Sequence, residues 1–526
     1  MRQSSRTTLA GLTGRPIRSI DVVTEQVDLG RGTLGTIATA LHVRTRPSTV
    51  RRQLRFAVGD TVDTLRIAES LRRLRQRRYL ADVEVEGTSC SGTDAVDLVV
   101  RTRDAWSTKA EVSMNSSSGG GTAGTTNQSS GTSSTVGLEE RNLLGSGRGA
   151  KLYVRSFGSR LGAGVLLDDP WFLGSAYSAQ LGSDSYRDGA DLRLRLAKRE
   201  QSMFDVWGSS LTMARGIRKV PGADTLRRDA ASLLVTRRLG SGEDVDQVTS
   251  AIFGVEGELT RLVAAPGAAL VGPAFAARRL VAIDLGMRRR TVRYDTLTWL
   301  LPGAAIVDVP LGVEGEVVAG AGWDMAAGAP ALHLDAWGGR AWLPNVGSLL
   351  TTDIWSSGYL TGGAWRAGNV RGAVTYRRNA KRGSWTTRLS AERLFAPDPD
   401  THALIADDPT TSILTDRLRL SQTAVAVGLE RSVRLRGLTR SWALVGAAFV
   451  AASLREDAAG YSPEMLTLGV AGLGLRAAPR RAGRGTFRLD VGYPIAGSSI
   501  VPRRFYLGLS VSPSFDQSRH RSGVDY

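Results

Sequence analysis

The sequence has one cysteine, four histidines and five lysines among its 526 residues. The single Cys90 excludes a disulfide framework within one chain and a site built from several thiolates. Neither a Gly-x-Ser-x-Gly turn nor a Gly-x-x-x-x-Gly-Lys phosphate loop occurs, so there is no linear signature of a hydrolase or a nucleotide-binding protein. The histidines lie far apart, and none belongs to a pair with the spacing of metal ligands: His42, His333, His402 and His520. We therefore expect a protein that is not an enzyme and holds no cofactor or metal ion.

Long hydrophobic runs are also missing. The longest apolar segment, Trp442–Ala452, is well short of the roughly 18 apolar residues that a membrane-spanning helix needs. The mean hydropathy is −0.11, with 42% hydrophobic residues and 61 glycines. These values exclude a bundle of membrane-spanning helices. A transmembrane β-barrel gives such an average because lipid-facing and lumen-facing residues alternate and cancel in any hydropathy window.

The formal net charge of +18 comes mainly from arginine. Clustered basic residues would indicate a nucleic-acid surface, but these arginines are spread from Arg2 to Arg521. An even spread is typical of solvated, lumenal or lipid-headgroup-facing side chains. We therefore expect no nucleic-acid partner.

The first residues carry no visible export signal. A signal peptide has a basic start, an apolar core and a small-residue cleavage site, and Met1–Pro16 has no apolar core. For an exported protein we expect that the signal has been removed or is encoded further upstream. Residues 1–16 are then predicted to be an N-terminal tail.

Residues 17–105 predict a small α+β domain. After a first strand, Pro47 suits the first turn of a helix. The segment Asp63–Arg78 predicts an amphipathic helix, with one apolar stripe and a remaining face of arginines that we expect to be solvated. Two strands follow, over residues 82–86 and 95–103. The order strand, helix, helix, strand, strand gives a sheet with an exposed edge that can accept another strand.

Residues 106–515 alternate between apolar and polar residues in segments of about ten, as in transmembrane strands. In Leu192–Ala197, for example, leucines alternate with arginines. A soluble sandwich would show the same alternation. Repetition over this length with almost no helical segment favours a closed transmembrane antiparallel β-barrel, in which every backbone group is paired. At roughly 25 residues per strand and connection we predict about 16 strands. Residues 516–526 are expected to form a C-terminal tail.

The pattern of turns and apolar residues in Leu54–Arg103 is more specific. Gly59-Asp60 precedes the long helix, Tyr79-Leu80 ends it, and Val83-Glu84-Val85 begins a pair of strands whose second member is rich in valine. This pattern resembles a polypeptide-transport-associated (POTRA) domain. The resemblance implies a periplasmic domain whose sheet edge pairs with extended client segments.

Several segments of the predicted barrel also match a known family. Val136–Gly147 has the character of a second barrel strand and its following turn, and Asp169-Pro170-Trp171-Phe172 that of a strand-ending turn. Three further segments match the last three strands: Gly472–Arg476, Phe487–Pro494 and Arg504–Phe515. Together they resemble the outer-membrane-protein assembly factors, the family that includes BamA, TamA and the two-partner secretion transporters. The resemblance implies a barrel in the bacterial outer membrane with its N-terminal domain in the periplasm.

That family has an inward-folded loop with a Val-Arg-Gly-aromatic motif that docks on acidic residues of the lumen. The nearest match here is Val370-Arg371-Gly372, followed by Ala373. Two interpretations stay open. Either Arg371 acts in the lumen with Glu392 as its acidic partner, or the motif is part of a strand.

The resemblance implies a barrel that assists the insertion or translocation of proteins through a seam between its first and last strands. We expect this seam between Ser107–Ser118 and Arg503–Phe515, because the serine-rich first strand offers little cross-strand packing. The candidate seam residues are Val112, Met114, Phe505, Leu507 and Leu509. The expected partners are the outer-membrane lipid bilayer with lipopolysaccharide, unfolded β-barrel client proteins and periplasmic accessory proteins.

Two other functions remain open at this point. A passive pore or structural barrel could keep the architecture without assembly activity, which a single soluble domain and an incomplete loop motif would suit. A lipid hydrolase of the outer membrane could assemble a Ser/His site from distant strands, and mutation of each histidine would test it.

Overall fold

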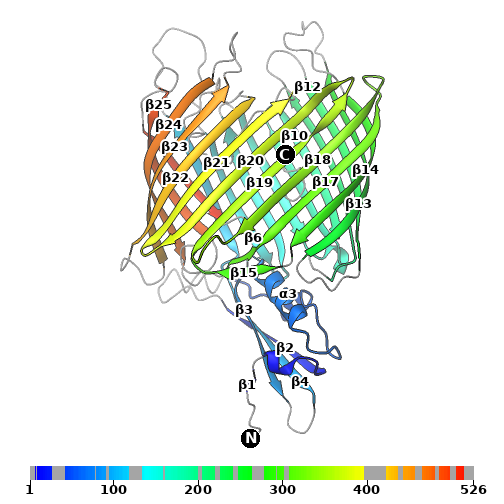
Figure 1. Cartoon of the computed structure of the whole chain (residues 1–526), viewed down its shortest axis with the longest axis vertical. Helices are drawn as coiled ribbons and strands as arrows, with labels where there is room; N and C mark the ends of the chain where they lie inside the picture. The colour runs from blue at the N-terminus through cyan, green and yellow to red at the C-terminus, as the bar shows by residue number, and fades with distance from the viewer. Residues whose placement is uncertain are drawn as a thin grey trace.

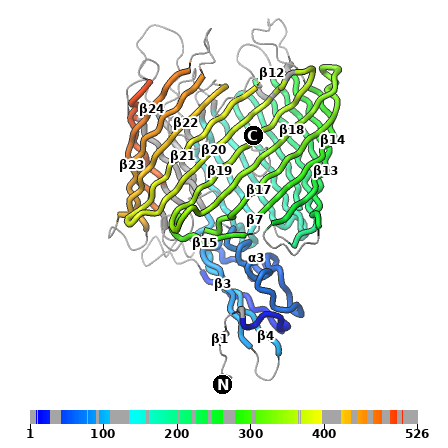
Figure 2. Tube along the Cα trace, in the orientation of Figure 1, coloured from blue at the N-terminus to red at the C-terminus, as the bar shows by residue number. Residues whose placement is uncertain are grey.

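The computed structural model shows how the alternating segments pair: they close into a barrel, with a small α+β domain at one end (Figure 1). The trace in Figure 2, from the same side, places the N-terminal domain in blue directly below the barrel wall. The structure describes residues 6–7, 9–26, 42–77, 79–89, 94–117, 133–157, 160–198, 204–219, 225–240, 247–263, 278–291, 293–300, 307–395, 422–435, 442–456, 465–479, 485–497 and 505–513.

The N-terminal domain is a four-stranded sheet with two helices. Its strands are in the order β1-β3-β4-β2, with β2 parallel to β4 and the other pairs antiparallel. The side chain of Asp63 caps the longer helix by accepting hydrogen bonds from the backbone N–H groups of Leu65 and Arg66. Leu74 from this helix and Leu98 from the sheet are fully buried in the core. The elements are β1 (Arg6–Thr7), η1 (Leu9–Leu12), β2 (Ile17–Glu25), α2 (Pro47–Arg51), α3 (Thr64–Arg75), β3 (Leu80–Ser89) and β4 (Val96–Asp104).

No helix in the described part of the chain is long and apolar enough to cross a membrane.

The predicted N-terminal tail, residues 1–16, is wrong for the part of it that the structure describes. Arg6 and Thr7 pair with Thr88 and Gly87 at the edge of the sheet. Leu12 is 1% exposed and belongs to the domain core. The tail was inferred from the lack of an apolar signal core, but two leucines in one short helical turn are enough to cover the end of a small sheet.

A short buried linker joins the domain to the barrel. Ala105 is fully buried, and its backbone N–H donates to the carbonyl of Tyr79 at 2.8 Å. Ser107 is 4% exposed, and its carbonyl accepts from the backbone N–H of Arg141 in the barrel at 3.2 Å. The connection is therefore hydrogen-bonded to both units that it joins.

Twenty strands of the described residues form the closed barrel, each antiparallel to its neighbours. They are β5 (Thr108–Ser117), β6 (Ser133–Leu143), β7 (Arg148–Phe157), β8 (Arg160–Asp169), β9 (Ser178–Tyr186), β10 (Gly189–Lys198), β11 (Trp207–Lys219), β12 (Thr225–Arg238), β13 (Gln247–Val263), β14 (Arg278–Thr291), β17 (Gly312–Asp324), β18 (Ala329–Trp342), β19 (Ser348–Thr361), β20 (Ala364–Ala380), β21 (Gly383–Phe395), β22 (Thr423–Leu435), β23 (Trp442–Glu456), β24 (Met465–Pro479), β25 (Gly485–Ala496) and β26 (Tyr506–Pro513).

The closed barrel confirms the predicted fold class, but the prediction of about 16 strands is too low. Several hairpins use very short turns: only Arg187 and Asp188 separate β9 from β10, and only Gly362 and Gly363 separate β19 from β20. Both glycines of the second turn have positive φ angles, which the tight connection requires. Strand and connection together therefore take roughly 20 residues rather than 25.

The outer face of the barrel is apolar and exposed. Along β14, Ile283 and Leu285 are 56% and 62% exposed, whereas their neighbours Ala282 and Asp284 are buried on the lumen side. The same alternation recurs along β13 and β17. Exposed apolar side chains on this scale would be unstable against water but are favourable against lipid. The structure is therefore that of a transmembrane barrel, not a soluble sandwich.

A hairpin lies between β14 and β17 at the end of the barrel that faces the N-terminal domain (Figure 1). It consists of β15 (Tyr294–Leu297) and β16 (Val307–Pro310). Leu297 and Val309 pack against Leu349 at the start of β19, so the hairpin has a small apolar core of its own. This core holds the hairpin in place below the strand ends, where α3 reaches it.

Candidate functional site at the barrel seam and the docked N-terminal domain

The turn between β6 and β7 holds the N-terminal domain. The carbonyl of Gly145 accepts two hydrogen bonds from the domain, from the backbone N–H of Arg46 and the hydroxyl of Thr49, each at 3.0 Å. The side-chain amide of Asn142 donates to the hydroxyl of Thr45 at 2.8 Å, and its oxygen accepts from the N–H of Gly147 at 2.8 Å. One side chain thus shapes the turn and binds the domain.

Both glycines of this turn are required by geometry. Gly145 and Gly147 each have a φ of 72°, a conformation that costs other residues free energy. A Cβ on Gly145 would lie 2.3 Å from the carbonyl oxygen of Arg44, and one on Gly147 would lie 2.7 Å from the hydroxyl of Tyr79. The turn that the sequence singled out is therefore a close contact between the two domains.

The arginines of α3 form a second docking surface, and the expectation that they are all solvated is wrong. Arg72 and Arg73 are 9% and 8% exposed. The guanidinium of Arg72 lies over the ring of Tyr294 in the hairpin at 4.6 Å, and Arg75 forms an ion pair with Asp308 of the same hairpin at 2.8 Å. Helical periodicity separates a polar face from an apolar one, but it does not reveal a charged partner supplied by a distant segment.

A third contact lies near the start of β11. Arg55 of the domain donates to both carboxylate oxygens of Asp205 at 2.7 Å, and Arg66 lies over the ring of Phe204 at 5.2 Å. Burial, together with the neighbouring cations of Arg55 and Arg77, lowers the pKa of Arg73 to about 10. The domain therefore meets three separate connections of the barrel, mainly through arginine.

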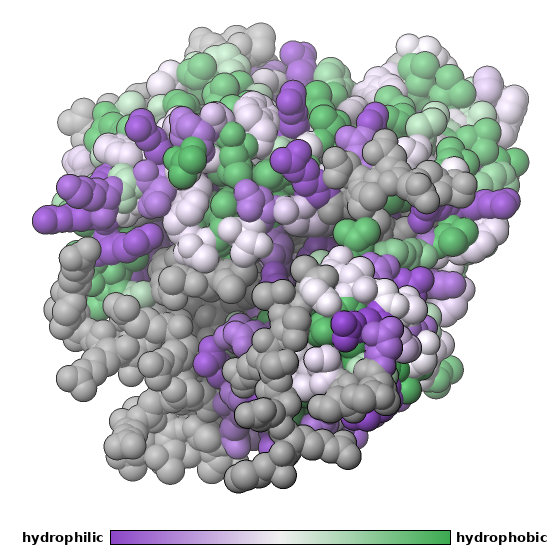
Figure 3. Space-filling model, turned by 60° about the horizontal axis from the view of Figure 1, so that its bottom comes forward, coloured by the Kyte–Doolittle hydropathy of each residue, from purple (hydrophilic) through white to green (hydrophobic). Residues whose placement is uncertain are grey.

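The sheet of the N-terminal domain has an edge that other strands could join. β1 covers β3 only at Gly87 and Thr88, and within the described residues no strand pairs with the outer edge of β3 from Asp82 to Val85. Seen from below, the coloured residues of this end of the molecule include many hydrophilic ones (Figure 3). A backbone edge without a paired strand is suited to pairing with an extended segment.

The barrel closes between β5 and β26 through a short ladder. Within the described residues, four residue pairs join these strands, from Tyr506 opposite Ser117 to Leu509 opposite Met114. The next ladders on either side, β5–β6 and β25–β26, each have eight pairs. Backbone pairing at the seam is thus half that of its neighbours.

The five candidate seam residues differ in their positions. Met114 and Leu509 are directly opposed in the ladder, and Leu507 is opposed to Ser116. Val112 pairs with Val136 of β6, below the four pairs of the seam. Phe505 precedes β26, is 70% exposed, and its ring lies 5.1 Å from that of Tyr493.

The candidate lumen motif lies within a strand, so the interpretation as an inward-folded loop is wrong. Val370, Arg371 and Gly372 pair on both sides, with β19 and with β21. Arg371 lies directly opposite Glu392, the acid expected to be its partner, and its guanidinium is 5.8 Å from the ring centre of Trp355. Glu392 accepts a hydrogen bond from the side-chain amide of Asn369 at 2.8 Å. The outward Val370 and Val374 show the ordinary alternation of a barrel strand, which explains the placement.

Two of the segments that resembled the last strands of the family meet in the lumen. Arg476 of β24 donates to Asp490 of β25 at 2.5 Å and to Glu430 of β22 at 3.1 Å. A Cβ on Gly474 would lie 2.1 Å from the Asp490 carboxylate, so glycine leaves room for the pair. These buried ion pairs tie the strands just before the seam to one another.

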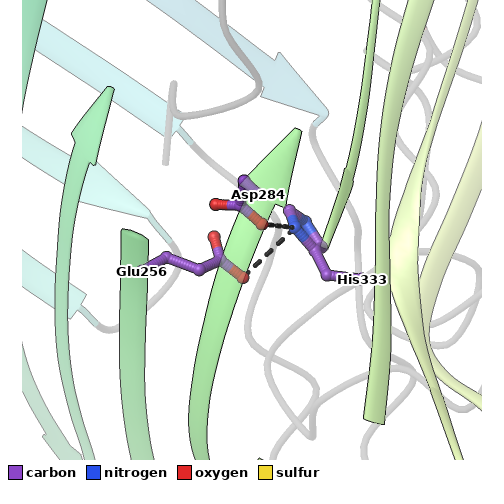
Figure 4. Close-up of side chains that lie close together, drawn as sticks. All are labelled: Glu256, Asp284 and His333. Carbon is purple, nitrogen blue, oxygen red and sulfur yellow. Dashed lines mark ion pairs between the residues drawn. The ribbon is translucent and has the colours of Figure 1, made fainter. Parts of the chain in front are cut away.

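A further lumen cluster, which no sequence motif indicates, is formed by Glu256, Asp284 and His333. These residues come from β13, β14 and β18 (Figure 4). The spacing of the histidines does not predict the cluster, because linear spacing finds metal or catalytic groups only within one segment. Alternation does indicate that each of the three faces the lumen, but not that they meet.

No protein-family model matches the chain, and no curated protein matches it either. Several solved structures are similar to it, among them two CdiB proteins and one BamA. CdiB from Acinetobacter baumannii is 13% identical, with a TM-score of 0.43 over 95% of this chain and 74% of that chain. CdiB from Escherichia coli is 12% identical, with a TM-score of 0.45 over 97% and 80%. BamA from Haemophilus ducreyi lacking POTRA domains 1–3 is 12% identical, with a TM-score of 0.36 over 95% and 85%. BamA, a member of the family that the sequence resembles, is one of these three structures.

Proposed function

We propose that the chain is an outer-membrane barrel that assists the insertion or translocation of proteins, in the manner of BamA and TamA. The observation that carries the proposal is the ladder between β5 and β26, which has four pairs in the described residues and leaves Ser510–Pro513 of β26 paired with β25 alone. Unpaired backbone at a strand edge is a template for another strand. A seam that breaks few hydrogen bonds on opening gives a client strand access to β5 and β26 at low cost.

The N-terminal domain serves as a POTRA domain in this proposal. The outer edge of β3 would hold an extended client segment by backbone pairing, as sheet edges do in β-augmentation. The buried linker with Ala105 and Ser107 is hydrogen-bonded to Tyr79 of the domain and leads directly into β5. A client held at the domain would thus be close to one of the two seam strands.

The apolar outer face supports a location in a lipid bilayer, and we assign it to the bacterial outer membrane with the N-terminal domain in the periplasm. The partners are then lipid and lipopolysaccharide around the barrel, unfolded β-barrel clients at the edge and seam, and periplasmic accessory proteins. The role requires no catalysis and no cofactor. His42, for example, is buried against Asp104 at 3.0 Å, which is suited to a structural role.

A disulfide lock tests the seam. With Cys90 replaced by serine, Met114→Cys and Leu509→Cys are at directly opposed positions of the ladder, the arrangement that a cross-strand disulfide requires. The matched control is Val136→Cys with Val154→Cys, an opposed pair in the β6–β7 hairpin. Oxidation of the seam pair should abolish client insertion into vesicles, reduction should restore it, and oxidation of the control pair should leave it intact.

A seam lock without effect, in a barrel that remains folded, would refute the lateral opening. In that case a passive pore or a structural barrel would be the better assignment. Conductance in a planar bilayer separates the passive pore from the structural barrel. A passive pore would show a steady current that is the same with the seam oxidised or reduced, and a purely structural barrel would show none.

A further inference from the structure

Three ligand-type atoms converge on one point of the lumen wall. The Nδ1 atom of His333 lies 3.2 Å from Oε1 of Glu256 and 3.5 Å from Oδ1 of Asp284 (Figure 4). All three atoms lie within 4.8 Å of one another. The side chain of Asp284 is 2% exposed, and those of His333 and Glu256 are 11% and 18% exposed.

None of these three atoms makes a hydrogen bond within the described residues, although each is buried. The neighbouring carboxylate of Glu258, two residues along β13, is different. It accepts hydrogen bonds from Arg278 at 2.9 Å and from the hydroxyl of Tyr359 at 2.9 Å, and it also pairs with Arg228. Buried polar atoms are normally satisfied in this way. The Glu256, Asp284 and His333 atoms are therefore exceptions that lie together.

The barrel makes room for this convergence with a glycine. Gly320 of β17 is directly opposed to Asp284 of β14 on one side and to His333 of β18 on the other. A Cβ on Gly320 would lie 2.1 Å from Oδ1 of Asp284. Only glycine therefore allows the carboxylate to reach across β17 toward the imidazole. On the far side, the ring of Tyr359 stacks on His333 at 4.9 Å and fixes its plane.

The charge and the distances both suit a divalent cation. Glu256 and Asp284 bring two carboxylates to the imidazole, and the nearby Asp335 adds to the negative potential that attracts a divalent cation. Ligands that share a tetrahedral Zn²⁺ at about 2.1 Å lie about 3.4 Å apart, and the two distances from Nδ1 are 3.2 and 3.5 Å. We propose that Glu256, Asp284 and His333 form a metal site for a first-row divalent ion such as Zn²⁺.

The donor set also indicates which ions would bind. One imidazole nitrogen with two carboxylates selects Zn²⁺ or Co²⁺ over Mg²⁺ and Ca²⁺, which prefer oxygen ligands only. Three protein ligands leave a position for water from the lumen. A bound ion would link β13, β14 and β18, which are not all adjacent in the barrel order. The bound ion would stabilise the barrel wall at strands that are not part of the seam. This role does not depend on any client activity.

The experiment uses tag-free, full-length protein that has been stripped with a chelator and titrated with Co²⁺ and then Zn²⁺ in detergent. We expect one Co²⁺ per chain, the intense visible bands of tetrahedral coordination, and their loss when Zn²⁺ displaces it. His333→Gln and Asp284→Asn should each weaken binding by at least about 100-fold, because a ligand is lost outright. The control Glu258→Gln should bind like the wild type.

Folding is monitored for every protein by its heat-dependent migration in detergent gels, which should also shift to higher temperature when Zn²⁺ is added to the wild type. Gly320→Ala is a second variant that keeps all three ligands but displaces the Asp284 carboxylate, and it should weaken binding too. If the folded wild type binds neither metal, or if His333→Gln binds it equally well, the cluster is only an ion triad around a protonated imidazole and the proposal is wrong.

Discussion

Replacing Gly145 with alanine should release the N-terminal domain from the barrel while leaving each unit folded. The variant Gly174→Ala is a matched control, because Gly174 has a φ of 75° in another connection at the same end of the barrel, and nothing lies within 4 Å of a Cβ placed there. Both variants carry the same cost of about 1 kcal/mol for alanine in a left-handed conformation. Only Gly145→Ala adds the contact at 2.3 Å with the carbonyl of Arg44.

The magnitude follows from the hydrogen bonds that cross the contact. Relieving the overlap requires the Arg44–Thr49 segment to move by about 1 Å, which breaks the two bonds to the Gly145 carbonyl and the one from Asn142 to Thr45. At about 1 kcal/mol each, the docked state loses about 3 kcal/mol. The ratio of docked to undocked protein should therefore fall by roughly 100-fold.

Amide hydrogen exchange in detergent measures this ratio. The N–H of Arg46 donates to Gly145 across the contact, so it should exchange roughly 100-fold faster in Gly145→Ala and at the wild-type rate in Gly174→Ala. The N–H of Ile67, bonded to Asp63 within α3, reports on the domain itself and should be unchanged in both. Equal protection of Arg46 in the two variants would refute the role of the turn in docking.

Two further predictions concern the outer face and the arginine contacts. Ile283→Arg, on the lipid-facing side of β14, should destabilise the barrel in vesicles by about 2 to 4 kcal/mol, whereas Val346→Arg, in the exposed turn after β18, should cost close to nothing, as measured by urea titration. Equal costs would mean that Ile283 is not in lipid. A double-mutant cycle of Arg75→Ala and Asp308→Ala is measured by the same hydrogen exchange of the Arg46 N–H. It should give a coupling free energy of about 1 kcal/mol, because the ion pair is mostly buried and hydrogen-bonded. Purely additive effects would show that the ion pair does not contribute to docking.

The features that the sequence predicted best depend on periodicity within one segment. Alternation places Ile283 outward and Asp284 inward and so predicts strands, and its repetition over residues 106–515 with almost no helical segment favours a closed sheet. The strand count was too low because it depends on turn lengths, and pairs such as Gly362-Gly363 close hairpins more tightly than the assumed average. The barrel closes between its first and last strands, but the number of residue pairs that the described residues form there depends on register, which no single segment encodes.

The interactions that the sequence could not predict join distant segments. The polar face of α3 is evident from periodicity, yet the carboxylate that pairs with Arg75 belongs to a hairpin more than two hundred residues away. His333 meets Glu256 and Asp284 only because Gly320 lies between two of them in the folded ladder. Val370-Arg371-Gly372 matched a loop motif by its letters, but continuous pairing on both sides places it in β20.

The buried linker between β4 and β5 determines which parts of the molecule can move as one. Ala105 is hydrogen-bonded to Tyr79, Ser107 is hydrogen-bonded to Arg141, and the β6–β7 turn is hydrogen-bonded to the N-terminal domain. The first strands of the barrel and this domain are therefore expected to move as one rigid unit. A hinge for seam opening is then expected on the β26 side of the seam. If the seam opens, β26 is expected to move, while β5 stays fixed to the N-terminal domain.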